Sequence, residues 1–222
     1  MRLKCKEIVK DIYQISFSSR KELTRTFLRF EEYFESPKFR GKIFSLNEFK
    51  KWYTANSPEG KKTKRFTYYE DWHGFNIPSE ILGPFYGGRF NPLSNEEKAV
   101  LRLFKNKRKK KLYIIATYKG ASQNTIQHEI AHGLFYTDSE YKREIIKILR
   151  NCDQKVKNKI INNYLSKYGG GYHPKVWLDE MHTYIMTNLD FLKNYKISSN
   201  KLLKTNKELN KVFKKYFKNI HN

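Results

Sequence analysis

The chain has 222 residues, enough for one domain with a sizeable core, and its 45 Lys and Arg against 22 Asp and Glu give a net charge of +23. Its two cysteines, Cys5 and Cys152, exclude a disulfide framework and suit a reducing compartment. Because charged residues recur from the start and no apolar run approaches ~18 residues, we expect no signal peptide, no membrane span and a cytoplasmic protein.

Helix-start patterns organise the first hundred residues. Three serines each stand three residues before a glutamate at the start of an amphipathic stretch, the arrangement of a capping box. These serines are Ser19, Ser45 and Ser94. We therefore predict that residues 1–100 form a mostly helical N-terminal subdomain. Within it, residues 66–69 are expected to form a short strand, and the Pro- and Gly-containing residues 72–90 an irregular aromatic segment.

A basic run at residues 105–111 follows this subdomain. It can be a solvated connection, a phosphate contact or a localisation signal. Because the excess lysine is spread over every region of the chain, we favour a general lysine coat over nucleic-acid binding. The alternative function is nevertheless a nucleic-acid-associated protein, either a protease working at DNA or RNA or a basic binding module with a structural metal.

The most informative motif is His128-Glu129-Ile130-Ala131-His132. Residues 112–118 are rich in β-branched and aromatic side chains and predict a strand, and after a turn Ser122 can cap a helix that runs to about residue 135. Residues four apart share a helix face, so both imidazoles can bind one metal ion while Glu129 lies beside a bound water. This pattern is typical of a catalytic zinc site.

A catalytic zinc site usually has a third protein ligand, and three residues compete for that place. Asp138 follows His132 by six residues, but it is better explained as a first-turn residue of the next helix, which Thr137 would cap. Glu180 lies on the predicted cleft face of a later helix, whereas His182 lies near the core face. We therefore predict Glu180 as the ligand and His182 as a buried histidine that supports the site.

With these residues, the segment 112–193 resembles the gluzincin branch of His-Glu-x-x-His zinc metallopeptidases, in which a glutamate on a later helix completes the site. The resemblance implies a peptide-bond hydrolase whose strand before the metal helix aligns an extended protein or peptide substrate. In thermolysin-like members an aspartate four residues after that glutamate supports the first histidine. This chain has Tyr184 there, so Asp179 or Asp138 would have to support His128 instead. Peptide deformylases share Gln127-His128-Glu129, but their cysteine ligand motif is absent.

Zinc chemistry then predicts the roles of the site residues. One Zn²⁺ per chain would lower the pKa of its water, and Glu129 would take the proton and return it to the leaving amine. Tyr184 and His173 are candidate catalytic donors to the oxyanion. We expect an endopeptidase, and exopeptidase action stays open.

Two further segments complete the expected architecture. Residues 138–151 and 153–168 are predicted helices, and residues 194–222 include a basic amphipathic helix, at 201–220, that docks on the core. The expected fold is therefore α+β and mainly helical, with a zincin-like metallopeptidase core at residues 101–193, a small β-sheet and an active-site helix.

Overall fold

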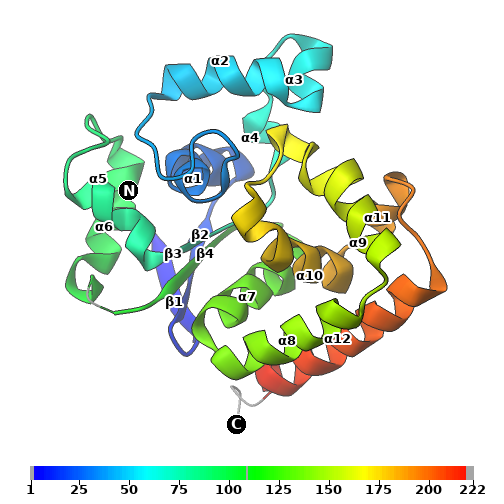
Figure 1. Cartoon of the computed structure of the whole chain (residues 1–222). Coiled ribbons are helices and arrows are strands. Elements are labelled where there is room, and N and C mark those ends of the chain that lie inside the picture. Colours follow the sequence, from blue (N-terminus) through cyan, green and yellow to red (C-terminus); the bar gives the residue numbers. More distant parts are fainter. Residues whose placement is uncertain (1–2, 109, 219–222) are drawn as a thin grey trace.

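The computed structural model describes residues 3–108 and 110–218. It is mainly helical, with one four-stranded mixed sheet in the order β1-β2-β4-β3 (Figure 1). Strands β1 and β2 are antiparallel, β2 and β4 are parallel, and β3 is antiparallel to β4. The strands are β1 (Lys4–Val9), β2 (Ile12–Phe17), β3 (Phe75–Pro78) and β4 (Tyr113–Tyr118).

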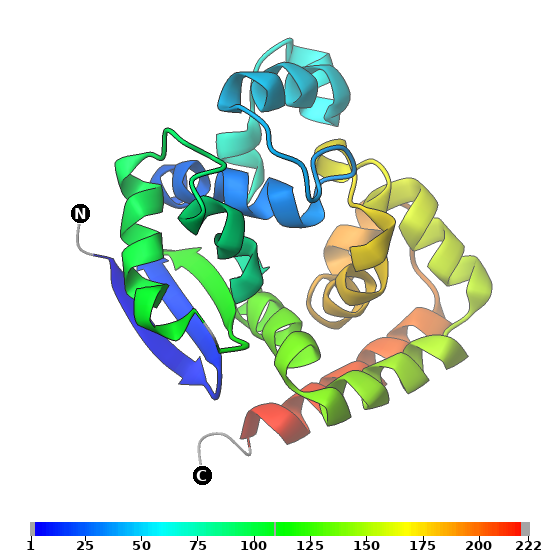
Figure 2. The same ribbon diagram turned by 60° about the vertical axis from the view of Figure 1, so that its left-hand side comes forward.

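The helices surround this sheet and occupy most of the remaining chain. They are α1 (Arg20–Glu35), α2 (Leu46–Asn56), α3 (Pro58–Thr63), α4 (Tyr68–Asp71), α5 (Gly83–Tyr86), α6 (Asn95–Phe104), α7 (Gln123–Thr137), α8 (Ser139–Asn151), α9 (Gln154–Ile160), α10 (Trp177–Thr187), α11 (Leu189–Asn194) and α12 (Asn200–Lys218). Figure 2 shows α7 between the sheet and α10. Among the described residues, no helix has the length and apolar character needed to cross a membrane.

The central strand β4 is buried on both faces. Its alternate side chains belong to different hydrophobic clusters, with Tyr113 and Ile115 on the side of α7, α8 and α10, and Ile114 and Ala116 on the side of α1, α2 and α6. Because both faces are covered, the strand is a continuous run of apolar side chains. It leads through a short turn, in which Gly120 has φ +103°, directly into α7.

The helix starts predicted in the first hundred residues are confirmed, and the strands there are not. Ser19, Ser45 and Ser94 are the N-caps of α1, α2 and α6. Strands β1 and β2 were not expected, because β1 is an exposed, lysine-containing edge strand with little apolar alternation.

Two local expectations for residues 66–90 are wrong. The expected strand at 66–69 overlaps the short helix α4, whose aromatic side chains pack among other rings, including that of Phe75 on β3, while its backbone pairs with no strand. The segment 72–90 is not irregular throughout, since it contains β3 and α5, and β3 is buried at all four positions.

The sheet spans the predicted boundary at residue 100, and the C-terminal helix packs on the core. The boundary at residue 100 runs through the sheet, because β4 pairs with β2 and β3 from the first hundred residues. Helix α12 packs against α8 and α10, with Leu202, Leu209 and Phe213 buried. Ile220, at the predicted end of this helix, lies outside the described residues.

Candidate metal centre

Helix α7 brings His128 and His132 together. Ser122 caps the helix by accepting a hydrogen bond from the backbone N–H of Thr125, as predicted. Both histidines are buried, and their Nε2 atoms lie 3.3 Å apart. The spacing of four residues thus directs both imidazoles to one point on the inner face of α7.

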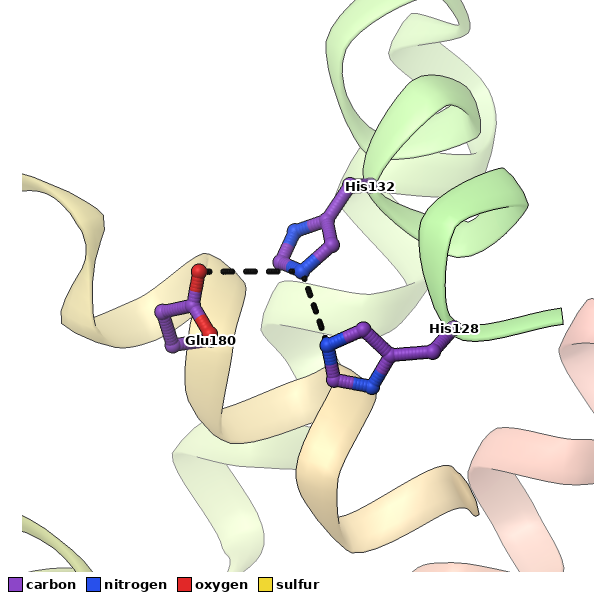
Figure 3. Close-up of side chains that lie close together, drawn as sticks. All are labelled: His128, His132 and Glu180. Atoms are coloured by element: carbon purple, nitrogen blue, oxygen red, sulfur yellow. Dashed lines mark hydrogen bonds and ion pairs between the residues drawn. The ribbon is translucent and has the colours of Figure 1, made fainter. Parts of the chain in front are cut away.

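Glu180, in the first turn of α10, completes the group. Its Oε1 atom lies 3.6 Å from Nε2 of His132 (Figure 3). Among the described residues, these three side chains form the one group whose ligand atoms all lie within 4.8 Å of one another. Ligand atoms 2.0–2.1 Å from a tetrahedral zinc ion are roughly 3.4 Å apart, so the spacing fits such an ion. A buried His-His-Glu group that can hold a metal ion is therefore present.

Thr187 orients His128. Its Oγ1 atom donates to the backbone carbonyl of Thr183 over 2.8 Å and lies 3.0 Å from Nδ1 of His128. Because the hydroxyl proton is already used, Thr187 accepts a hydrogen bond from Nδ1–H of His128. The Nε2 lone pair of His128 is thereby left free to bind a metal ion.

Asp179, a candidate support for His128, lies instead beside His132. Its Oδ1 atom lies 3.0 Å from Nδ1 of His132 and 3.3 Å from Nδ1 of His182. Both distances are those of ion pairs, although neither contact is aligned as a hydrogen bond. The negative charge favours a proton on Nδ1 of His132, so its Nε2 atom also turns a lone pair towards Glu180.

The Nε2 atoms of the two histidines and the carboxylate of Glu180 are all acceptors, and they face the same point. Such an arrangement is favourable only when a metal ion or a proton lies between them. Burial opposes a charge on His132, but Asp179 and Glu180 raise its pKa to about 10. Burial and the charge of Glu35 raise the pKa of Glu180 well above its usual value. Metal binding at this point is thus expected to displace protons, as is usual for His and carboxylate ligands.

Glu129 lies beside the metal ligands on α7 and is also buried. Its Oε2 atom accepts a 2.8 Å hydrogen bond from the side-chain amide of Asn76 on β3, whose own carbonyl oxygen accepts from Tyr113. Burial raises the pKa of Glu129 to about 7. A Cβ atom at Gly74 would lie only 2.2 Å from Oε1 of Glu129, so any other residue there would displace this carboxyl group.

The metal ligands and Glu129 all line one cavity of about 310 Å³. Side chains of α1, the segment before β3 and the 168–172 loop form its other walls. Tyr184 also lines the cavity, and its hydroxyl lies 3.1 Å from that of Tyr172. The structure thus brings His128, Glu129, His132, Glu180 and Tyr184 together.

The other candidates have different places. Asp138, rather than Thr137, is the N-cap of α8, accepting hydrogen bonds from the backbone of Glu140 and Tyr141, and it is not part of the metal-binding group. His182 is fully buried beside Asp179, as predicted, and its support of the site stays a prediction.

His173 does not line the cavity. Its Nδ1 atom accepts a hydrogen bond from the backbone N–H of Lys175, at the turn that precedes α10. The side chain of His173 is thus used as a local cap, and its role as an oxyanion donor stays a prediction that the cavity lining does not favour.

Most of the strand before the metal helix is not free to align an extended substrate. That strand is β4, which lies inside the sheet between β2 and β3. Residues 113–116 are paired on both edges, so their backbone groups are not free to pair with a peptide.

Part of the basic run 105–111 packs against tyrosine rings. Lys107 donates to the hydroxyl of Tyr13 over 3.0 Å, Arg108 lies 4.1 Å above the ring of Tyr86, and Lys111 lies 4.5 Å above that of Tyr136. Lys109 lies outside the described residues. These three basic side chains therefore pack against the protein surface and are not simply solvated.

Several residues of the site were not expected from the sequence. They are Asn76, Thr187 and the glutamates of α1 that line the cavity, Glu31, Glu32 and Glu35. The available signal was the position of these glutamates among Phe30, Tyr33 and Phe34, which places carboxylates in an aromatic stretch at the end of the helix.

Comparison with protein-family models, curated proteins and solved structures finds no match for this chain.

The buried glutamates lead to a pH-dependent stability, which Glu32 illustrates. Burial raises the pKa of Glu32 to about 8, from 4.5 for an exposed carboxyl group. Between these values the folded chain binds more protons than the unfolded chain, so the contribution of Glu32 becomes more destabilising as the pH rises. The free energy of unfolding of Glu32→Gln, minus that of the wild type, should therefore increase from pH 5 to pH 8. The increase is at most ~1.4 kcal/mol per unit of pKa shift.

Urea unfolding of chelator-treated protein at the two pH values measures this difference. Glu140→Gln, which removes an exposed carboxylate outside the cavity, should show little such trend. An advantage of Glu32→Gln that stays constant or shrinks towards pH 8 would contradict the prediction.

Proposed function

We propose that this chain is a zinc-dependent metallopeptidase of the gluzincin type. His128, His132 and Glu180 would hold the ion, and Glu129 would act as the general base. The observation that carries this proposal is the convergence of three acceptor atoms on the wall of a cavity, with the buried carboxyl group of Glu129 beside them.

The open side of the group favours an enzyme over a structural metal site. A structural zinc ion is usually closed by four protein ligands, whereas a catalytic ion keeps one position for water or substrate. The described residues supply a group of three, and all three line the cavity. This also speaks against the alternative of a basic binding module with a structural metal.

The mechanism uses the chain's own residues for proton transfer. Zinc, when bound, makes a water acidic and polarises a carbonyl group. Glu129 then takes a proton from the attacking water and delivers it to the leaving amine, a task suited to a carboxyl group whose pKa is raised to about 7. Asn76 holds the carboxylate in place through its 2.8 Å hydrogen bond. Tyr184 is the proposed hydrogen-bond donor to the developing oxyanion.

Metal removal tests the proposal. We expect the purified protein to cleave members of a mixed peptide library, to lose this activity with a chelator, and to regain it with one equivalent of zinc. Mass spectrometry identifies the products and elemental analysis counts the ion. Cleavage that is indifferent to the chelator, or a zinc-loaded protein that cleaves no peptide in the library, would contradict the proposal.

A further inference from the structure

The cavity is acidic in a strongly basic protein. Six carboxylate side chains line it, and no described lysine or arginine does, although basic residues outnumber acidic ones 45 to 22 in the chain. Two of the six, Glu129 and Glu180, belong to the candidate metal centre. The remaining four are Glu31, Glu32, Glu35 and Asp71.

Three of these four lie at the end of α1, where negative charge is disfavoured. A helix C-terminus carries partial negative charge, and the last turn of α1 has no basic residue. Glu31, Glu32 and Glu35 are nevertheless at most 8% exposed. Positions that oppose local stability in this way are often functional ones.

Asp71 and Glu32 have partners within the protein. The Oδ2 atom of Asp71 accepts hydrogen bonds from Tyr53 over 2.7 Å and from Thr67 over 2.8 Å. Glu32 lies beside the hydroxyl groups of Tyr68 and Ser36, which offset part of the effect of burial on its pKa. These two carboxyl groups are therefore accounted for by the fold.

Glu31 and Glu35 are less well satisfied. Oε2 of Glu31 accepts one 3.3 Å hydrogen bond, from the backbone N–H of Asn76. Oε1 of Glu35 is buried and has no hydrogen-bond partner, and the guanidinium of Arg40, whose charge Glu35 influences, donates instead to the carbonyl of Phe34. The carboxyl groups of Glu31 and Glu35 also lie within hydrogen-bond reach of each other, and the two repel when both are charged. Two adjacent buried carboxylates without a cation are costly, so a cation that enters the cavity would be bound there.

The spacing favours an organic cation over a second metal ion. Among the described residues, Glu31 and Glu35 do not join a third ligand in any group with all its atoms within 4.8 Å. Other cavity walls carry the aromatic side chains of Trp72, Tyr168 and Phe191. Aromatic faces bind alkylammonium and guanidinium groups through cation–π contacts.

The site also lies close to the candidate metal centre. The charge of Glu35 is the strongest charge effect on Glu180, and Glu31 and Glu35 both lie within electrostatic reach of Glu129. A cation held by α1 would therefore position a peptide bond beside the metal ligands.

We propose that Glu31 and Glu35, together with the aromatic side chains of the cavity, bind a cationic group of the substrate, an alkylammonium or guanidinium. The inference rests on the proposed peptidase function and names its substrate class. The cation is either the N-terminal amine of a peptide or the side chain of a lysine or arginine residue next to the cleaved bond.

Zinc-loaded Glu129→Gln allows peptide binding to be measured without cleavage. Calorimetry would compare two pairs of peptides, one with a free or an acetylated N-terminus, the other with lysine or norleucine at one position. In one of the two pairs, the cationic peptide should bind at least about 10-fold more tightly than its neutral partner. The pair that shows this difference identifies the source of the cation. Adding Glu35→Gln, or Glu31→Gln, should bring this ratio close to one, whereas adding Glu140→Gln should leave it unchanged.

Thermal unfolding and zinc content show whether each variant is folded, and Glu31→Gln replaces Glu35→Gln if the latter is not. Equal affinities within both peptide pairs, no binding of any of these peptides, or a ratio that survives both substitutions would overturn the inference. Charge-selective binding by a wild-type protein that cleaves no peptide would count against the peptidase alone, while cleavage without charge selectivity would count against the inference alone.

Discussion

Replacing Glu129 with glutamine is expected to lower the rate of peptide hydrolysis by about 100- to 10,000-fold, the usual effect of removing a general base. Glutamine has nearly the size and helix propensity of glutamate, and its amide oxygen can accept the same hydrogen bond from Asn76. The variant should therefore fold and bind zinc. The measurement is kcat/KM on a peptide that the wild type cleaves, with zinc content and thermal unfolding recorded on the same samples.

Glu140→Gln is the matched control, because it makes the same chemical change at an exposed position outside the cavity. It should cleave like the wild type. Comparable cleavage by Glu129→Gln and wild type would show that Glu129 is not the base. An inactive Glu129→Gln that has also lost zinc would show that the residue holds the metal centre together rather than moving a proton.

Removing a metal ligand is expected to have the second large effect. The wild type should bind one zinc ion per chain, and His128→Ala, His132→Ala and Glu180→Ala should each lose it or bind it far more weakly, since two ligands remain. Elemental analysis after dialysis against a weak chelator measures the loss. Full zinc occupancy in Glu180→Ala, with loss in His182→Ala or Asp138→Ala, would transfer the role of third ligand to one of those residues.

A graded variant tests the support of His132 without removing a ligand. Asp179→Asn keeps the size of the side chain but removes the charge 3.0 Å from Nδ1 of His132, so zinc affinity should fall about 10- to 100-fold. Asp138→Asn is its control, because asparagine is an equally good N-cap for α8. Equal zinc affinity in both variants would assign Asp179 no part in orienting the histidine.

The parts of the site that depend on residues close together in the sequence were predictable. The spacing of His128 and His132 by four residues places both on one face of a helix, and Ser122 marks where that helix begins. The helical periodicity of residues 177–187 also selected Glu180 over His182 for the metal-binding position. Each of these conclusions needs only the geometry of a single helix.

What only the tertiary structure decided is which distant residues surround that helix. Asn76, on a strand 53 residues away from Glu129 in the sequence, and Thr187, 59 residues away from His128, reach the site through sheet pairing and helix packing, which no local pattern encodes. The place of β4 inside the sheet depends on its pairing with β2 and β3, which lie far from it in the sequence. Strand β2 is rich in apolar side chains and was missed, whereas β1 has too little apolar alternation to predict a strand. In the same way, α1 carries Glu31 and Glu35 to the cavity because its apolar side chains pack against the sheet, so a helix-bound acidic cluster becomes one wall of the site. Local propensity sets the elements and their faces, whereas long-range burial of apolar surface determines which faces meet.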